Sequence, residues 1–374
     1  MKIYIEKDVF LEALQLVINI SPKKTSEPII NNVLLETDEN QKLQVKATNY
    51  ESTFSGSFKC EVQEPGRICV STNKLFNLVK EFWDSRILIN ATPQNWVFLT
   101  SGNSKVKLPG VSPDHFPVIE FKELSKSINI PGAYLRSAID LTYIGIGENE
   151  SRKSLMGLNL EIIGSDMIHW TGADAYRICQ YQSSLPTPIE EKGNIIIPKK
   201  SLTEIKRIID FSDENVSMSF DENTFQIITD QVKFKTSLIE AEYPNLKSLI
   251  NTPVLNPITV SKTDIINAVR ILNTVTDSDS NSIMKITIQS GKMVLESQKM
   301  EFGEGNDEIN CDYSGEEISI GLNIRFFLDA LQIFESSDDE SIHLSISGRE
   351  APVTLYCDEW SNFKTILMPV RIQW

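Results

Sequence analysis

The chain has 374 residues, of which 41% are hydrophobic, so it is long enough for roughly two to four domains with cores of their own. Its formal net charge of −15 argues against a protein that simply coats DNA, because affinity for phosphates comes mainly from Lys and Arg. No run of about 18 uncharged apolar residues occurs, which excludes a membrane-spanning helix, and the alternating, acidic N-terminus does not resemble a signal peptide.

The first third of the chain alternates strand patterns with amphipathic helix patterns. A strand at Ile3–Ile5 leads into a helix predicted over residues 6–20, where apolar residues recur three and four apart. Alternation at Lys42–Ala47 predicts an antiparallel strand, and a second strand-to-helix step ends in a helix over 74–82. A strand at Lys105–Leu108 follows, and then an apolar residue with proline.

The same order of elements recurs twice more. In the middle third, the matching segments are Ile128–Ile130, 131–147, 198–209, Val216–Phe220, Phe234–Leu238 and Tyr243-Pro244. In the final third, they are Ile258–Val260, 261–276, 322–334, Ile342–Ile346, Phe363–Leu367 and Met368-Pro369. Ala13, Ala138 and Ala268 occupy one place in the three opening helices and lie 125 and 130 residues apart. Several landmarks that keep one period indicate a triplicated unit.

This repetition predicts an α+β fold of three like domains, each with two helices packed on antiparallel sheets. We place the domains at residues 1–122, 123–253 and 254–374, because each boundary falls just before a strand that restarts the pattern.

Residues that could carry catalysis form no recognisable group. The three histidines lie far apart, and no phosphate-binding glycine loop, nucleophile elbow or His-Glu-x-x-His motif occurs. Asp277–Asn281 resembles the start of a calcium loop, but Ser282 stands at its sixth place and Ile288 at its twelfth. The five cysteines are scattered without a Cys-x-x-Cys pair, which favours a reducing compartment. We expect a cytoplasmic protein that is not an enzyme and has no cofactor or metal.

Positive charge gathers in the predicted helices. The six helices together carry +3, so the remaining residues carry −18, and the clearest basic cluster is Lys199, Lys200, Lys206 and Arg207. This favours a helix-lined surface that faces a polyanion, with scattered charge as the alternative. Aromatic residues are not interleaved with these lysines and no base-reading motif occurs, so we expect sequence-independent contacts to phosphates.

The chain resembles the bacterial DNA polymerase β sliding clamp, the processivity subunit of the replicative polymerase. The resemblance extends over nearly the whole chain and is most specific at a few segments. The most specific segments are Glu27–Asn32, Thr171–Arg177, Glu242–Pro244 and Met368–Arg371. The resemblance implies a head-to-tail homodimer that forms a ring of six domains, with helices lining the hole. A ring held on double-stranded DNA by topology needs little direct affinity, which reconciles a DNA partner with the acidic charge.

The resemblance also implies a pocket for short peptide motifs of the replicative polymerase catalytic subunit, the clamp loader and other clamp-motif proteins such as repair factors. Apolar side chains suit such a cleft, and Met adapts to varied partners. The residues alone would favour ordinary core packing at strand ends. The implied lining is Leu155, Ala173, Asp174, Ala175, Tyr176, Arg177, Ile178, Pro244, Leu249, Ile366, Met368, Pro369, Val370 and Arg371.

Two further sets of residues follow from the resemblance. At the dimer seam, Val106 and Leu108 of one chain should meet Ile271 and Leu272 of the other, and Leu272→Asp is expected to give monomers. For DNA contact, it points to Lys24, Lys74, Lys80, Asn149, Arg152, Lys199 and Lys200.

The chain departs from the family at four places. Ala175-Tyr176 replaces a common Gly-His pair, Ser248 stands where some members have arginine, and Asp277–Asn281 is acidic where the family is often basic. Gln373-Trp374 extends past the usual end. We expect these differences to alter the preference for peptide motifs and to weaken DNA contact by the third domain.

Two other functions remain open from the sequence. The chain could be a repeat scaffold that binds peptide motifs without DNA, which retention on circular DNA would distinguish. It could also be an enzyme whose site has no known motif, which an activity screen would reveal.

Overall fold

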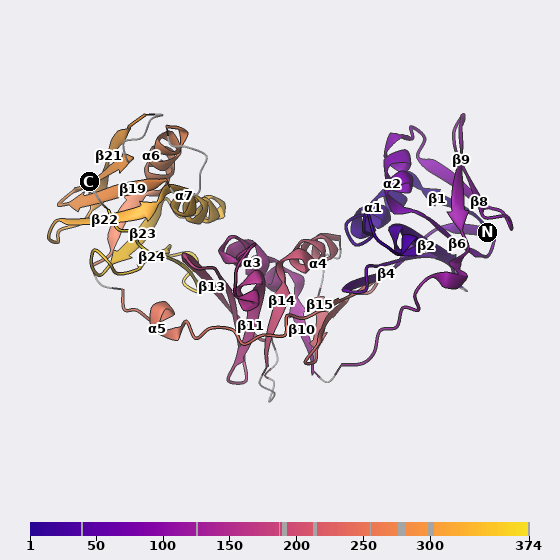
Figure 1. Ribbon diagram of the computed structural model, residues 1–374, viewed down its shortest axis with the longest axis horizontal. Helices are drawn as coiled ribbons and strands as arrows, with labels where there is room; N and C mark the ends of the chain where they lie inside the picture. The colour runs from indigo at the N-terminus through magenta and orange to yellow at the C-terminus, as the bar shows by residue number, and fades with distance from the viewer. Residues whose placement is uncertain are drawn as a thin grey trace. The chain divides into compact units, whose positions relative to one another are not determined.

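The computed structural model describes all residues except 39, 125, 187, 189–192, 212–214, 255, 276–281, 298–302 and 373–374. The chain divides into two compact units (Figure 1). Unit 1 comprises Met1–Leu135 and Lys200–Leu238, and unit 2 comprises Arg136–Lys199 and Ile239–Trp374. Among the helices described, none has the length and apolar character needed to span a membrane.

Unit 1 is built on one antiparallel sheet in which strands from two repeats pair. Strand β17 lies beside β4, with Phe234 opposite Phe54, and both rings are fully buried. Across the sheet the order is β10 (Lys126–Pro131), β15 (Asn215–Phe220), β16 (Thr224–Ile228), β17 (Val232–Ser237), β4 (Ser52–Lys59), β3 (Lys42–Thr48), β2 (Asn32–Thr37), β6 (Arg67–Ser71), β9 (Ser104–Val111), β8 (Trp96–Ser101), β7 (Arg86–Ala91), β1 (Lys2–Glu6) and β5 (Glu61–Glu64).

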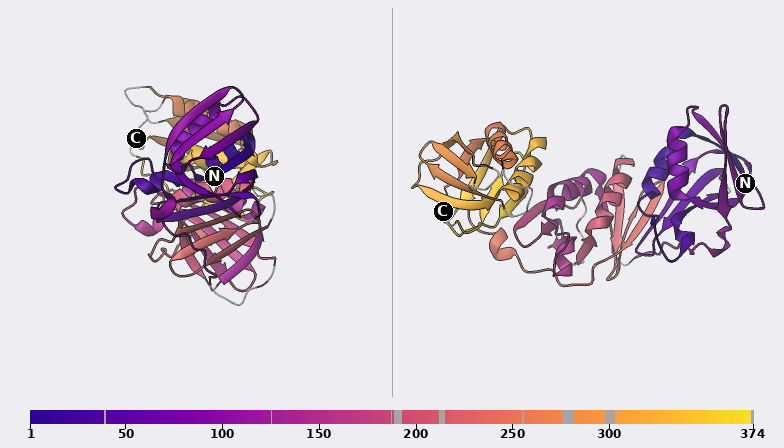
Figure 2. Two further views of the ribbon diagram at one scale, coloured as in Figure 1. Left: turned by 90° about the vertical axis from the view of Figure 1, so that its right-hand side faces the viewer. Right: turned by 45° about the horizontal axis from the view of Figure 1, so that its top comes forward.

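Helices α1 (Lys7–Val17) and α2 (Thr72–Glu81) lie together on one side of this sheet (Figures 1 and 2). Four of the five buried residues of α1, Phe10, Ala13, Leu14 and Val17, follow the three-and-four spacing of one helix face, and Leu16 is buried beside them. That face packs against strands β1, β3 and β4, so the core of the first repeat lies between the helices and the sheet.

Unit 2 has a second antiparallel sheet that also joins two repeats. Strand β13 pairs with β25, which places Ile178 opposite Ile366. Across the sheet the order is β14 (Asn194–Pro198), β11 (Gly157–Ile163), β12 (Met167–Ala173), β13 (Arg177–Ser184), β25 (Phe363–Leu367), β24 (Val353–Tyr356), β23 (Ser341–Ile346), β18 (Ile258–Ser261), β21 (Asn306–Asp312), β20 (Lys292–Ser297), β19 (Ile283–Gln289) and β22 (Ile318–Asn323).

Two of the remaining helices, α6 (Lys262–Thr274) and α7 (Ile324–Ile333), begin at polar capping residues that follow strands. Ser261 caps α6, because its Oγ accepts a hydrogen bond from Asp264 N at 3.3 Å. Helix α6 packs on α7, and α3 (Gly132–Thr142) and α4 (Lys199–Phe211) each contain the division between units. The short segments are α5 (Lys247–Ile250), η1 (Pro28–Asn31), η2 (Pro113–His115), η3 (Tyr143–Gly145), η4 (Lys153–Met156) and η5 (Phe334–Ser336).

The predicted α+β architecture of helices on antiparallel sheets is confirmed, and the six predicted helices are present with ends shifted by a few residues. Helix α5 was not predicted, because four residues are too short to show a helical period. The Asp277–Asn281 loop and the Gln373-Trp374 extension lie outside the described residues.

Candidate peptide-binding site and nucleic-acid interface

A tight turn between β12 and β13 holds Asp174, Tyr176 and Arg177, the end of the Thr171–Arg177 segment. Asp174 shapes this turn, because its Oδ1 accepts hydrogen bonds from the backbone N–H groups of Tyr176 and Arg177, each 2.8 Å long. A carboxylate that bonds the backbone two and three residues ahead stabilises a turn locally. The side chains of Tyr176 and Arg177 therefore leave the turn in fixed directions.

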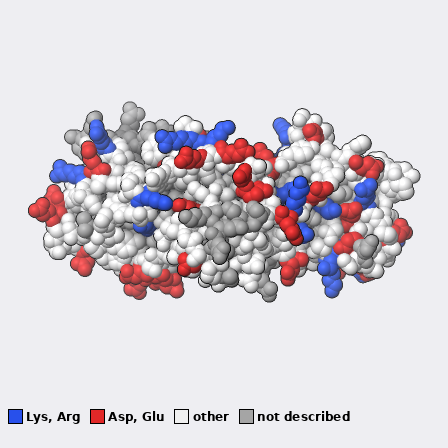
Figure 3. All heavy atoms as spheres, turned by 90° about the horizontal axis from the view of Figure 1, so that it is seen from below, with Lys and Arg blue, Asp and Glu red and all other residues white. Residues whose placement is uncertain are grey.

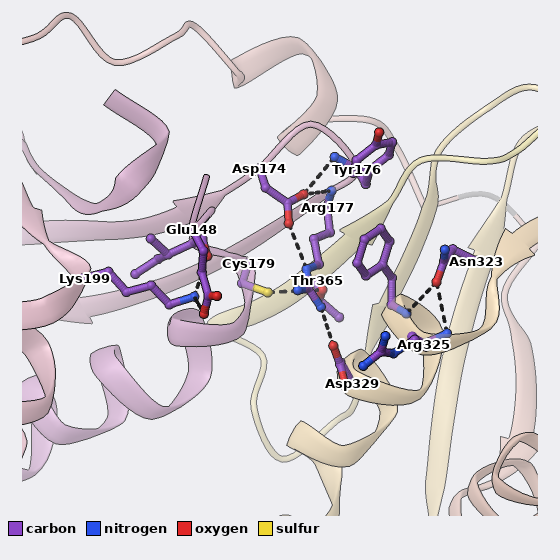
Figure 4. A network of polar contacts seen from close by, with 12 residues as sticks. Glu148, Asp174, Tyr176, Arg177, Cys179, Lys199, Asn323, Arg325, Asp329 and Thr365 are labelled. Carbon is purple, nitrogen blue, oxygen red and sulfur yellow. Dashed lines mark hydrogen bonds and ion pairs between the residues drawn. The ribbon is translucent and has the colours of Figure 1, made fainter. Parts of the chain in front are cut away.

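Arg177 joins this turn to helix α7. Its Nε donates to Asp174 Oδ2 at 3.1 Å, and its Nη1 donates to Asp329 Oδ2 at 2.8 Å (Figure 4). Its guanidinium carbon lies 4.6 Å from the centre of the Phe326 ring. Burial alone would lower the pKa of Arg177, but the bonds to Asp329 and Asp174 outweigh burial, and the pKa is raised. The cation is thus held charged between two carboxylates.

Tyr176 brings the turn, helix α7 and the C-terminal segment together. Its ring stacks on Phe326, with ring centres 5.3 Å apart and an interplanar angle of 29°. The residue is still 54% exposed, so part of its surface can meet a ligand. Its carbonyl oxygen accepts a hydrogen bond of 2.8 Å from Met368 N, which places the Met-Pro-Val-Arg segment beside the turn.

An apolar cluster lies next to the turn. Several of the predicted lining residues pack in this cluster, together with residues of α5 and the segment before it. Its buried members are Leu155, Ala173, Ile178, Ile250 and Ile366, and its partly buried members are Tyr243, Leu246 and Leu249. Partly buried apolar side chains over a buried floor form a surface on which apolar peptide residues can pack.

The other predicted lining residues vary in exposure. Asp174, Pro244, Met368, Pro369 and Val370 are half-buried, and Ala175 and Arg371 are exposed. The backbone N–H of Val370 donates to Gly321 O at 2.8 Å, so the C-terminal segment is fixed along β22. The Arg371 side chain is 87% exposed and meets only the exposed Glu350, with 3.6 Å between Nε and Oε1.

The contribution of helix α7 to this site was not predicted from the sequence. Phe326 and Asp329 hold Tyr176 and Arg177, and neither was in the predicted lining. The sequence does contain a signal for the start of this helix, namely the capping residue Asn323. Its Oδ1 accepts hydrogen bonds from the backbone N–H groups of Arg325 at 3.0 Å and Phe326 at 3.1 Å. This capping residue sets the start of α7 and hence the direction of Phe326.

A hollow of about 620 Å³ lies elsewhere in unit 2, beside α3 and α7. Its wall includes Arg136, Asp140, Tyr181, Asp329 and Trp360, and it contains none of the predicted pocket residues. Asp329 therefore lines this hollow and also binds Arg177.

The predicted DNA-contact residues are exposed, with one exception. In unit 1 the exposed residues are Lys24, Lys74, Lys80 and Lys200, and in unit 2 they are Asn149 and Arg152. The Lys199 side chain is only 15% exposed, and its Nζ donates to Ile146 O at 2.7 Å. Lys199 is therefore engaged within the protein.

The distribution of charge limits where a polyanion can bind. On the face shown in Figure 3, basic and acidic side chains of the described residues are interspersed. Such a mixed surface attracts phosphates weakly, because the two signs cancel within about a Debye length of 8–10 Å. The six long helices of the structure, in contrast, carry a combined formal charge of +3.

Strands β9 and β21 each leave part of one edge unpaired within the chain. Residues 104–109 of β9 pair with β8 on one side, and β9 pairs with β6 only at Gly110 and Val111. Residues 306–310 of β21 pair with β20, and β21 pairs with β18 only at Cys311 and Asp312. An open edge is a template for pairing with a strand of another chain.

The predicted seam residues differ in how far they are exposed. Val106 and Leu108 are half-buried in β9, and Ile271 of α6 is 59% exposed. Leu272, however, is 1% exposed and belongs to the core. Consecutive residues of a helix point about 100° apart, so Ile271 presents the larger side-chain surface to a partner. Contact of Leu272 with the other chain remains a prediction.

The described residues offer neither a metal-binding cluster nor an activated thiol. No group of three or more His, Cys, Asp or Glu residues there is placed to hold a metal ion. All five cysteines are free, and burial raises the pKa of Cys60 and Cys179 to about 11 and that of Cys69 to about 12. These thiols stay protonated near neutral pH and are poor nucleophiles.

Comparison with known proteins gives matches along nearly the whole chain. Models of the N-terminal, central and C-terminal domains of the DNA polymerase III beta subunit match residues 1–120, 129–245 and 247–371. The beta sliding clamp of Bacillus subtilis is 25% identical over 383 residues, covering 99% of this chain and 100% of the relative. That of Chlamydia pneumoniae is 26% identical over 373 residues, covering 100% of this chain and 99% of the relative.

Solved structures show the same fold. The DNA polymerase III subunit beta of Pseudomonas aeruginosa has a TM-score of 0.90 at 21% identity, with full coverage of both chains. A putative DNA polymerase III beta subunit from Eubacterium rectale has a TM-score of 0.88 at 23% identity, also with full coverage of both. The three consecutive domain matches confirm the predicted threefold repeat, and the chain belongs to the family of DNA polymerase III beta subunits, the beta sliding clamps.

Proposed function

We propose that the protein is a sliding clamp, a head-to-tail homodimer that closes round duplex DNA and tethers the replicative DNA polymerase to it. The observation that carries this proposal is the match of all three beta-subunit domains, in order, over nearly the whole chain. The charge supports it, because a protein of net charge −15 with mildly basic helices is better held on DNA by topology than by affinity.

Closure of the ring would use the two open strand edges. Strand β9 of one protomer would add to β21 of the other, in the manner of β-strand augmentation. The charges are complementary, because β9 carries Lys105 and Lys107 whereas β21 carries Asp307 and Glu308. The exposed Ile271 lies on α6, which packs on β21, and would cover the seam from one side.

Retention on circular DNA tests encirclement. The protein would be loaded with a clamp loader on nicked circular duplex and passed through a sizing column before and after the circle is cut once. We expect co-elution with the closed circle and loss after cutting, because a ring slides off a free end. Equal retention on both forms would indicate ordinary binding, and no retention on either would favour the repeat scaffold that acts without DNA.

We propose that the Tyr176–Arg177 turn, the apolar cluster and the Met368–Arg371 segment form a docking site for short peptide motifs. The polymerase catalytic subunit, the clamp loader and other clamp-motif proteins would share it. Its chemistry supports this role, because the half-buried Leu249 and Met368 can receive apolar side chains while Tyr176 and Arg177 supply a polar rim.

Calorimetric titration with a short Gln-Leu-x-Leu-Phe peptide tests the docking site. We expect micromolar binding at one site per chain, and Leu249→Asp should weaken it by about tenfold or more, since a buried charge replaces an apolar contact. Val118→Asp, at an apolar residue that is 86% exposed in unit 1, is the matched control. The same titration with a chain ending at Arg371 shows whether Gln373 and Trp374 compete for the site.

We further infer that the protein acts by binding and not by catalysis, and that it works in the bacterial cytoplasm, where the chromosome is replicated. The protonated thiols and scattered histidines support the first point. Nuclease or phosphatase activity that co-purifies with the chain through several columns would contradict it.

A further inference from the structure

The loop over residues 147–152 is hydrogen-bonded at its base to a residue of the apolar cluster. Its base is closed by a hydrogen bond of 3.0 Å from Gly147 N to Leu155 O. Leu155 is 6% exposed and is at the same time a member of the cluster proposed to receive peptides. The loop also carries the exposed Asn149 and Arg152, so one short segment connects the two proposed binding sites.

Lys199 holds the start of this loop. Its Nζ donates to Ile146 O at 2.7 Å and to Glu148 Oε1 at 3.2 Å, and it lies 4.8 Å from the centre of the Tyr143 ring. Figure 4 shows the Lys199 and Glu148 side chains meeting at this point. Hydrogen bonds from a cation to a buried carbonyl oxygen are stronger than hydrogen bonds between neutral groups. The methylene chain of Lys199 is also largely removed from solvent here.

The root of the loop is also packed tightly on strand β12. A Cβ atom on Gly145 would lie 2.6 Å from Gly172 O, and one on Gly172 would lie 2.3 Å from Thr142 O. Backbone contact this close leaves no room for the root to shift without moving β12. The next residue of β12, Ala173, belongs to the apolar cluster.

We infer that Lys199 is a positioning residue, which fixes the root of the 147–152 loop and through it the Leu155 wall of the peptide site. The inference rests on the proposed clamp function for the roles of the two sites. It differs from the family resemblance, which treats Lys199 as a contact to DNA phosphates. Its neighbour Lys200 is exposed and remains suited to phosphate contact.

Limited proteolysis tests the positioning role without any ligand. Trypsin cuts after Arg152 and Lys153, which lie in and next to the loop. In Lys199→Met we expect cleavage there to be about tenfold faster than in the wild type, since the hydrogen bonds of Lys199 to Ile146 and Glu148 no longer oppose local opening. Lys200→Met should be cut at the wild-type rate, and Lys199→Arg, which keeps a donor and a cation, should restore protection.

Peptide and DNA titrations then distinguish positioning from phosphate contact. We expect Lys199→Met to bind the Gln-Leu-x-Leu-Phe peptide several-fold more weakly at an unchanged midpoint of global unfolding, while Lys200→Met binds it normally. The inference would be overturned if Lys199→Met were cleaved at the wild-type rate and bound the peptide with wild-type affinity, while the number of ions released on DNA binding fell by about one. Failure of the wild type to bind peptide would contradict the docking site instead, and the cleavage result would still decide the role of Lys199.

Discussion

Arg177 connects local turn geometry to the packing of a distant helix. Its side chain is 12% exposed, and its two carboxylate partners differ, since that of Asp174 is 8% exposed and that of Asp329 is 44% exposed. Removal of a cation from such a site leaves a poorly solvated carboxylate behind, which costs more than the bond itself contributes. Lysine cannot replace it, because a single ammonium does not match the fork that reaches both carboxylates.

Arg177→Met should lower the free energy of unfolding of unit 2 by about 1–3 kcal/mol, since Asp174 loses its charged partner while the turn keeps its backbone bonds. Urea denaturation followed by tryptophan fluorescence measures this change. Arg371→Met is the control, because its exposed pair with Glu350 should contribute nothing measurable. An Arg177→Met protein that unfolds at the wild-type urea concentration would show that the bridge adds no stability.

His169 should make unit 2 sensitive to mild acid. Burial lowers the pKa of His169, with nearby Lys247 and Lys364 acting in the same direction and Glu161 opposing them. Below the unfolded pKa of about 6.5 the unfolded chain takes up a proton that the folded protein resists, so stability falls as the pH falls.

We therefore expect the wild type to lose more stability between about pH 7 and pH 5 than His169→Gln does. Chemical denaturation at both pH values checks this prediction. Parallel loss in the two proteins would assign the acid sensitivity to other groups.

At the scale of elements, helix α6 has two faces with different uses. Ile265, Ile266, Ala268, Val269 and Leu272 form the buried stripe, and Ile271 stands outside it. An isoleucine that is 59% exposed on a packed helix is a candidate for contact with a second chain, whereas Leu272 is needed for the fold of its own domain.

Ile271→Asp should give folded monomers, because it places a charge in the proposed seam without disturbing the core. Leu272→Asp should instead destabilise the domain. Sedimentation gives the mass of each variant, and thermal unfolding shows whether it is folded. A stable dimer of Ile271→Asp would remove α6 from the seam.

Local pattern predicted the elements well and their partners poorly. The repeat and the six long helices follow from periodicity, which is a property of neighbouring residues. The pairing of β17 with β4 and of β13 with β25 joins different repeats, and no local signal in Phe234 or Ile178 encodes it. The resemblance assigns Lys199 to DNA contact, and its charge is visible in the sequence, whereas its carbonyl acceptor at Ile146 depends on the tertiary fold.

For the whole molecule, the acidic charge should separate two kinds of DNA binding. A loaded ring is retained by closure, whereas direct binding to linear duplex depends on a few exposed lysines working against a charge of −15. The lifetime on circular DNA should hardly change with salt, while affinity for linear duplex should fall at least about tenfold between 50 and 200 mM salt.

Surface-tethered circles and linear duplexes at the two salt concentrations provide the measurement. Equal salt sensitivity of the two would mean that the lysines, and not closure, keep the protein on DNA.

The two shared sheets have a consequence for how the chain is made. The middle repeat, residues 129–245, has no sheet of its own, since β10 and β15–β17 belong to one sheet and β11–β14 to the other. On the ribosome, β4 can pair with β3, but its other edge stays open until β17, residues 232–237, has emerged. Likewise β13 can pair with β12, but its other edge stays open until residues 363–367 have emerged. The nascent chain thus exposes an unpaired strand edge almost until translation ends, and chaperone binding matters most during this period. A message truncated after the second repeat would yield a product whose β13 edge never finds its partner.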